Sequence, residues 1–178
     1  MSPTSDTGGA PPQVVVIVDS SVLIDMKHKV GINEQWDVLM TMSSLVAAGA
    51  LAFPKQVAKE LANGQHPDAP GVWANRAKRD VCHREPSEAT LSKVLEVAPE
   101  VVDLEATADR EIADPYVAAM AVEIQVRTGS LVVVATNDRI DRLPLKLSLL
   151  TACGRLGISV CSTEQFLEWV KGGEMQRG

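Results

Sequence analysis

The feature that most constrains the fold is an apolar run over residues 13–18, QVVVIV, which ends in Asp19, Ser20 and Ser21. An uninterrupted Val/Ile run of this length is typical of a strand buried on both faces, as in parallel sheets. Ligands of open α/β sheets bind at the carboxyl ends of such strands. A buried carboxylate there is unfavourable unless a positive charge meets it, and no lysine or arginine lies within six residues of Asp19. The sequence therefore indicates a cation bound beside Asp19.

The rest of the chain alternates short apolar runs with helical patterns. Residues 131–135 are expected to form a second buried strand, and residues 50–53 and 158–160 two shorter ones. This alternation predicts an α/β fold with three layers, in which helices flank a central, mainly parallel sheet. Ser162 and Gln165 match a capping box before the last helix. Helices are expected over residues 21–27, 35–48 (with Asn33 as a candidate cap), 54–62, 87–98, 114–126, 151–156 and 166–170, and residues 66–85 are expected to be irregular.

Length and composition favour one domain without a membrane span. The 178 residues suit a single domain over residues 13–172, between an expected disordered tail at 1–12 and a flexible tail at 173–178. No signal-peptide pattern and no apolar run long enough to cross a bilayer is visible. Three cysteines without a close pair favour a reduced, cytoplasmic protein. The net charge of −6 argues against a general nucleic-acid coat protein, but it is compatible with a nuclease whose acidic ligands contribute to that charge.

Four acidic residues stand out because of their places in the expected elements. They are Asp19 after the first strand, Glu60 in the third expected helix, Asp114 at the head of the fifth, and Asp138 after the second long strand. Several carboxylates that converge on one point require a metal ion or protons, and hard divalent cations prefer oxygen ligands. Phosphoryl transfer is the chemistry that uses such a cluster.

Taken singly, each of these acids has a simpler interpretation. Asp114 before Pro115 fits an ordinary helix N-cap, Asp138 fits a turn, and Glu60 fits a solvated helix position. Asp141 is a rival for the place of Asp138, because it follows three residues later. The metal-site interpretation therefore rests on the set of acids rather than on any one of them.

The order of these acids resembles that of PIN domains. The motifs that carry the resemblance are Val18-Asp19-Ser20-Ser21, the helix with Glu60, Ala113-Asp114, and Thr136-Asn137-Asp138, within residues 14–170. The resemblance implies a PIN-like fold and a metal-dependent ribonuclease, a phosphodiester hydrolase that cleaves RNA with Mg²⁺ or Mn²⁺. It implies that Asp19, Glu60, Asp114 and Asp138 are the catalytic and metal-binding acids, and that the hydroxyls of Ser21 and Thr136 orient them.

The resemblance also suggests partners. Many bacterial PIN proteins are toxins of type II toxin–antitoxin pairs, the VapC type among them, so a cognate antitoxin protein and a second copy of the chain are candidate partners beside RNA. An alternative of a different class is a non-catalytic PIN-like module that binds RNA or protein. A response-regulator receiver is disfavoured because the last expected strand is followed by Cys161-Ser162-Thr163, without the required lysine. A haloacid dehalogenase is disfavoured because the second residue after Asp19 is Ser21 and not an aspartate.

Basic residues gather in the segment that is expected to be irregular. Trp73 is a candidate base-stacking surface there, and the nearby candidates for phosphate contact are Arg76, Lys78, Arg79 and Arg84. The alternative is a solvated charged face. Elsewhere, Asp25 is expected to be solvated on its helix, and Cys153 and Cys161 are expected to fill the core.

Overall fold

The computed structural model describes residues 10, 12–63, 68–107 and 112–175. Most of the tail expected at residues 1–12, and the last three residues of the tail expected at 173–178, lie outside the described residues. So does His66.

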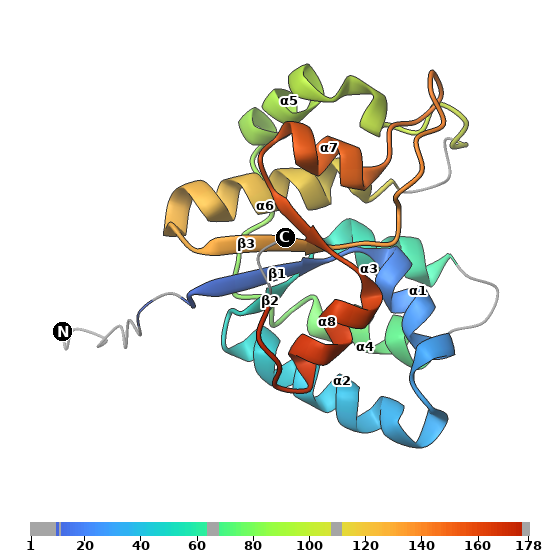
Figure 1. Ribbon diagram of the computed structural model, residues 1–178, viewed down its shortest axis with the longest axis vertical. Coiled ribbons are helices and arrows are strands. Elements are labelled where there is room, and N and C mark those ends of the chain that lie inside the picture. Colours follow the sequence, from blue (N-terminus) through green and yellow to red (C-terminus); the bar gives the residue numbers. More distant parts are fainter. Residues whose placement is uncertain (1–9, 11, 64–67, 108–111, 176–178) are drawn as a thin grey trace.

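A four-stranded parallel sheet forms the centre of the molecule (Figure 1). Its strands are β1 (Val14–Val18), β2 (Leu51–Ala52), β3 (Leu131–Ala135) and β4 (Ser159–Cys161), in the spatial order β2-β1-β3-β4. The central pair runs in register from Val14 opposite Leu131 to Val18 opposite Ala135, and all but the first residue of each of these strands is buried. Burial on both faces explains why their sequences are apolar without alternation.

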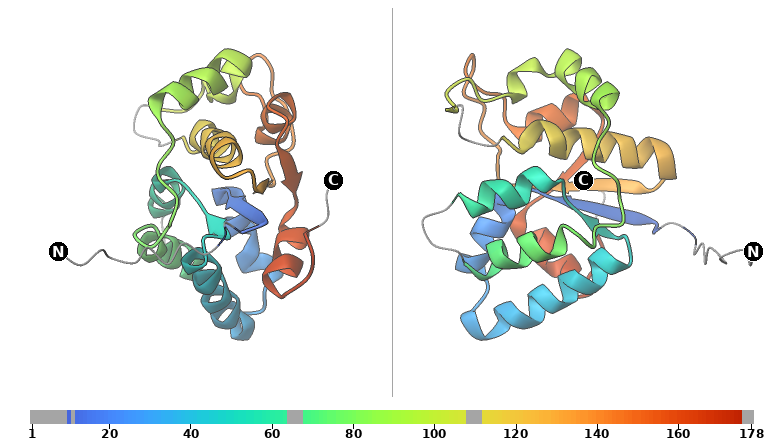
Figure 2. Two further views of the ribbon diagram at one scale, coloured as in Figure 1. Left: turned by 90° about the vertical axis from the view of Figure 1, so that its left-hand side faces the viewer. Right: turned by 180° about the vertical axis from the view of Figure 1, so that it is seen from behind.

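Helices cover both faces of this sheet (Figures 1 and 2). One layer contains α5 (Glu88–Val97), α6 (Asp114–Thr128) and α7 (Leu149–Arg155), together with the short 3₁₀ helix η1 (Pro99–Val101). The predicted three-layer α/β architecture is thereby confirmed, with every strand pair parallel. The opposite layer contains α1 (Ser20–Lys29), α2 (Ile32–Ala47) and α8 (Thr163–Val170), with α3 (Lys55–Ala62) and α4 (Ala69–Ala77) packed beside them.

The segment over residues 66–85 is not irregular throughout, so that prediction is wrong. Helix α4 begins after Asp68, whose side chain accepts a hydrogen bond from the Gly71 N–H at 2.9 Å. Pro70 and Gly71 make the helix hard to predict because both residues disfavour a helix interior, although proline is well tolerated in a first turn. The apolar face of α4 packs in the core, which stabilises the helix despite these residues.

Trp73 on α4 belongs to the core, and the prediction that it stacks on bases is wrong. Its side chain is only 8% exposed. The indole N–H donates to Ser43 Oγ at 2.9 Å, and the ring packs on Phe53 with centroids 5.6 Å apart. A tryptophan in this setting contributes packing between α2, α4 and the end of β2.

The sequence predicts the start of α8 correctly but not the starts of α2 and α7. The capping box of Ser162 and Gln165 is confirmed before α8. Helix α2 begins at Ile32 after Gly31, so Asn33 is not its cap. Helix α7 begins at Leu149, earlier than predicted, because the Ser148 side chain caps it.

The remaining expectations concern cysteines and membrane spans. Cys153 and Cys161 are buried in the core, as predicted, while Cys82 is exposed, and all three are free thiols. None of the helices in the described part of the chain has the length and apolarity needed to cross a lipid bilayer.

Ser148→Ala tests the cap of α7. The fully buried Ser148 hydroxyl accepts from the Thr151 N–H at 3.2 Å and donates to Asp141 Oδ1 at 2.7 Å. We expect the substitution to lower the free energy of unfolding by about 1–2 kcal/mol, measured by urea denaturation. Ser44→Ala, which removes an exposed hydroxyl on α2, should change it by less than about 0.5 kcal/mol. Equal losses in the two variants would contradict this assignment.

Candidate functional site

A cavity of about 660 Å³ that is lined by several acidic side chains lies where the carboxyl ends of β1 and β3 meet the helices. The pairing of the two strands places their ends side by side at the cavity. It continues one residue past the end of β1, where the Asp19 N–H donates to Ala135 O at 3.0 Å. All four predicted acids line the cavity, which are Asp19, Glu60, Asp114 and Asp138. Asp103 and Lys146, which the sequence did not single out, also line it.

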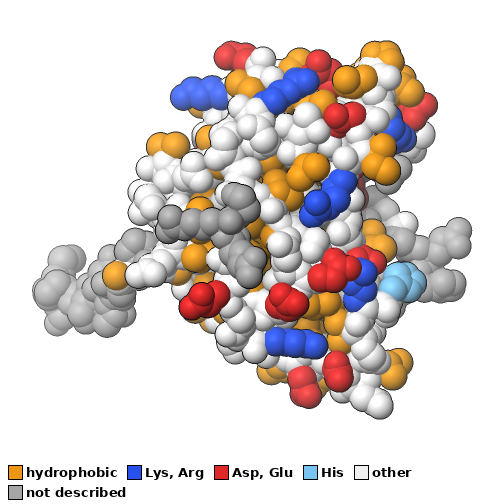
Figure 3. Space-filling view, in the orientation of Figure 1, with side chains coloured by type: hydrophobic (Ala, Val, Ile, Leu, Met, Phe, Trp, Pro, Cys, Tyr) orange, Lys and Arg blue, Asp and Glu red, His pale blue; other side chains and the backbone are white. Residues whose placement is uncertain are grey.

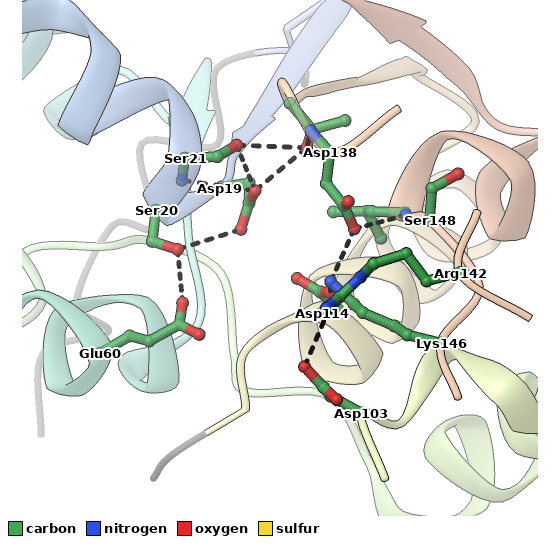
Figure 4. Close-up of polar contacts among 12 residues, drawn as sticks. Asp19, Ser20, Ser21, Glu60, Asp103, Asp114, Asp138, Arg142, Lys146 and Ser148 are labelled. Carbon is green, nitrogen blue, oxygen red and sulfur yellow. Dashed lines mark hydrogen bonds and ion pairs between the residues drawn. The ribbon is translucent and has the colours of Figure 1, made fainter. Parts of the chain in front are cut away.

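Asp19 is the most deeply buried of the acids, at 1% exposure. Its Oδ2 accepts from the Ser21 hydroxyl at 2.6 Å and from the Thr136 hydroxyl at 3.0 Å (Figure 4). The Ser21 hydroxyl in turn accepts from the Asn137 N–H at 3.0 Å. One oxygen of Asp19 is thus held by two hydroxyls, and this fixes the orientation of the carboxylate.

Glu60 reaches the cavity from α3 and is linked to Asp19 through Ser20. The Ser20 hydroxyl donates to Glu60 Oε2 and contacts Asp19 Oδ1 at 3.4 Å. Figure 4 shows the serine between the two acids. Ser20 was not among the predicted site residues, and its only signal in the sequence is its place next to Asp19.

Lys146 lies between the other two acids. Its Nζ is 2.7 Å from Asp114 Oδ2 and 2.8 Å from Asp138 Oδ2, and its side chain is only 14% exposed. The same Asp138 Oδ2 also accepts from the Leu149 N–H at 2.9 Å, at the start of α7. The lysine comes from a loop without helical or strand periodicity, so sequence patterns gave no reason to select it.

The electrostatics of the cavity disfavour the charged form of Asp114. Burial, together with the neighbouring charges of Asp19 and Asp138, raises the pKa of Asp114 to about 8 against the opposing effect of Lys146. Burial alone would lower the pKa of Lys146, but the carboxylates of Asp114 and Asp138 outweigh it and raise that pKa. The cavity therefore carries more negative charge than its own lysine balances.

The acids line one cavity, but their oxygens are not arranged as a complete set of metal ligands. Within the described residues, no group of three or more His, Cys, Asp or Glu side chains is close enough to hold a metal ion as the side chains stand. Glu60 is separated from Asp19 by one serine hydroxyl, and Asp138 from Asp114 by one ammonium group. The acidic oxygens are of the type that Mg²⁺ and Mn²⁺ prefer.

A family model described as Domain of unknown function (DUF4411) matches residues 16–171. The chain belongs to the DUF4411 family. The crystal structure of PAE2754 from Pyrobaculum aerophilum is similar to 89% of this chain and 97% of its own, with 17% identity and a TM-score of 0.49. A search of curated proteins gives no match to the sequence. The family match includes all four acids and Lys146.

Asp141 does not join the acidic cluster of this DUF4411 chain. Its carboxylate accepts from the Ser148 N–H at 2.9 Å, the Ser148 hydroxyl at 2.7 Å and the Thr151 hydroxyl at 3.1 Å. These hydrogen bonds lower the pKa of Asp141. Asp141 therefore anchors the first turn of α7, and Asp138 is the acid that faces the cavity.

Asp25 has partners in the folded DUF4411 chain, so the prediction that it is simply solvated is wrong. Its Oδ2 accepts from Asn137 Nδ2 at 2.9 Å, and the same amide donates to Thr163 Oγ1 at 2.6 Å. Asn137 thereby joins the end of β3 to α1 and α8. This contact positions the loop that carries Asp138.

Asp114→Asn tests the electrostatic strain in the DUF4411 site. Because folding raises the pKa of Asp114, the folded protein holds more protons than the unfolded chain between about pH 4 and pH 8, and stability falls as pH rises through that window. In EDTA at pH 8, we expect the amide to increase the free energy of unfolding by on the order of 2 kcal/mol and to flatten its pH dependence.

Asp141→Asn is the matched control, measured by urea denaturation in the same buffers. The pKa of Asp141 is lowered by folding, so its contribution is present at pH 8 and is lost as pH falls through its folded pKa. The control should therefore destabilise the protein at pH 8. A less stable Asp114→Asn variant under those conditions would overturn the strain argument.

Proposed function

We propose that this chain is a divalent-metal-dependent endoribonuclease of the PIN type, which hydrolyses RNA phosphodiester bonds with Mg²⁺ or Mn²⁺. One observation carries the proposal. Four carboxylates from four separate segments of the chain line one cavity at the carboxyl edge of a parallel sheet. That edge is where α/β sheets bind ligands, and acids gathered there suit cation-assisted phosphoryl transfer.

The residues of the chain have distinct tasks in this proposal. Asp19, Glu60 and Asp114 would hold the cation, with Ser20 between the first two. Ser21 and Thr136 keep Asp19 in one orientation through hydrogen bonds of 2.6 and 3.0 Å. When bound, a divalent ion would lower the pKa of the attacking water and stabilise the charge that develops on the phosphate.

RNA would approach through the rim of the cavity rather than across a broad basic surface. The face drawn in Figure 3 intersperses Lys and Arg with Asp and Glu. Arg142 pairs with Asp103, which lines the cavity, at 3.3 Å. Arg76 lines a separate apolar groove between α2 and α4 and does not line the acidic cavity. Phosphate contact is therefore assigned to Arg142 and Lys146, in preference to the basic cluster around residue 76.

The PIN resemblance extends the proposal to a biological role. The chain would be the toxin of a type II toxin–antitoxin pair, acting in the cytoplasm, with a cognate antitoxin protein and a second copy of itself as partners. The groove between α2 and α4 offers an apolar contact surface for a protein partner, since Trp36 is 67% exposed and Met40 is 50% exposed there.

One observation favours the alternative, a non-catalytic PIN-like module that binds RNA or protein. The ion pairs of Lys146 with Asp114 and Asp138 satisfy part of the acidic cluster without any metal. Calorimetric titration with Mn²⁺ separates the two functions, because a nuclease of this type must bind the ion and a binding module need not.

Cleavage of a mixed RNA pool tests the proposed activity. We expect Mn²⁺-dependent cleavage that EDTA abolishes and that Asp19→Asn reduces by at least about 100-fold, because the amide removes the central anionic ligand. Asp37→Asn, at an exposed position on α2, should retain full activity. Equal cleavage by the wild type and the Asp19 variant, or cleavage in EDTA, would refute the proposal.

A further inference from the structure

Lys146 is held by its backbone as well as by its two acidic partners. Its N–H donates to Arg142 O at 3.1 Å, and its carbonyl accepts from the Arg142 N–H at 2.8 Å. The next residue, Leu147, donates its N–H to Glu100 O at 2.6 Å and is buried. The ammonium group is therefore presented to the cavity from an anchored loop.

This lysine differs from the lysines that form ion pairs on the surface. Lys27 and Lys29 are 39% and 35% exposed in their pairs, whereas Lys146 is 14% exposed and contacts two carboxylates. Exposed pairs contribute little because solvent screens them. An ammonium desolvated between two acids has a large electrostatic effect on anything charged that binds beside it.

The contacts divide the acidic cluster into two sides (Figure 4). On one side Ser20 joins Asp19 and Glu60. On the other side Lys146 joins Asp114 and Asp138, and Asp138 Oδ2 accepts two donors, the ammonium at 2.8 Å and the Leu149 N–H at 2.9 Å. An oxygen that already accepts two donors at these distances is a poor ligand for a second metal ion.

We propose that the Lys146 ammonium is the cation on the side of the cluster formed by Asp114 and Asp138, where it takes the place of a second divalent ion. The inference rests on the proposed function and deepens it, because the site would then bind one Mg²⁺ or Mn²⁺, and Asp19, Glu60 and Asp114 would hold it. Two-metal nucleases hold their ions about 3.5–4 Å apart between shared carboxylates. In this chain Asp114 would be the shared carboxylate, because it already contacts the Lys146 ammonium at 2.7 Å, and the ammonium would take the second position.

The role of Lys146 follows from its charge and its fixed position. It reduces the repulsion between Asp114 and Asp138 without a metal ion. It also sets a positive charge beside the cavity, where the negative charge of a bound phosphate would lie. Lys146 is thus a positioning residue for the acids and a fixed electrostatic partner for the substrate.

Counting bound Mn²⁺ tests this inference. Electron paramagnetic resonance measures free Mn²⁺ in titrations of the wild type, Lys146→Gln, Lys146→Arg and the surface control Lys29→Gln, with folding checked by circular dichroism. We expect one bound ion in the wild type, the arginine variant and the control. We expect a second ion in Lys146→Gln, because the neutral amide leaves the Asp114–Asp138 side without its cation.

The outcomes separate this inference from the proposed function. Two ions in the wild type overturn the inference even if Lys146→Gln does not fold, and RNA cleavage by that protein would leave the nuclease intact. A single ion in folded Lys146→Gln also overturns it. A wild type that binds no Mn²⁺ overturns both the inference and the proposed nuclease.

Discussion

The parallel pairing of β1 and β3 is the interaction on which the rest of the structure depends. The register that sets Val18 opposite Ala135 also sets Asp19 beside Thr136, whose hydroxyl donates to Asp19 Oδ2 at 3.0 Å. Both strands are buried on both faces, so a slip in register would misplace apolar side chains throughout the core. The geometry of the acidic site is therefore enforced by packing that lies outside the site.

The folded chain tolerates a concentration of negative charge that works against its own stability. Asp19 and Asp114 are both buried, and the charge of Asp19 makes the ionisation of Asp114 more costly. Two hydroxyl groups donate hydrogen bonds to the buried carboxylate of Asp19, and one ammonium offsets the cost of ionising Asp114. Local strain of this kind is common where a site is built for a ligand rather than for stability.

The loop between β3 and α7 connects structural and chemical roles. Asp138 contacts Lys146 in the cavity and also accepts from the Leu149 N–H at the start of α7, while Asp141 binds the capping Ser148. The two acids lie three residues apart, yet one faces the cavity and the other faces the helix. The position of α7 and the position of Lys146 are consequently set by the same short segment.

The sequence by itself determined the α/β class, the central strands, the capping of α8 and the buried carboxylate of Asp19, because each depends on local patterns of apolar residues and caps. Helix α4 and the burial of Trp73 were missed, because contacts with distant segments stabilise them against Pro70 and Gly71. The linking roles of Ser20 and Lys146 were decided only by tertiary structure. Each depends on acids that lie far apart in the chain and come together where the strands end. The spacing of apolar residues along the sequence gives no sign of such a contact.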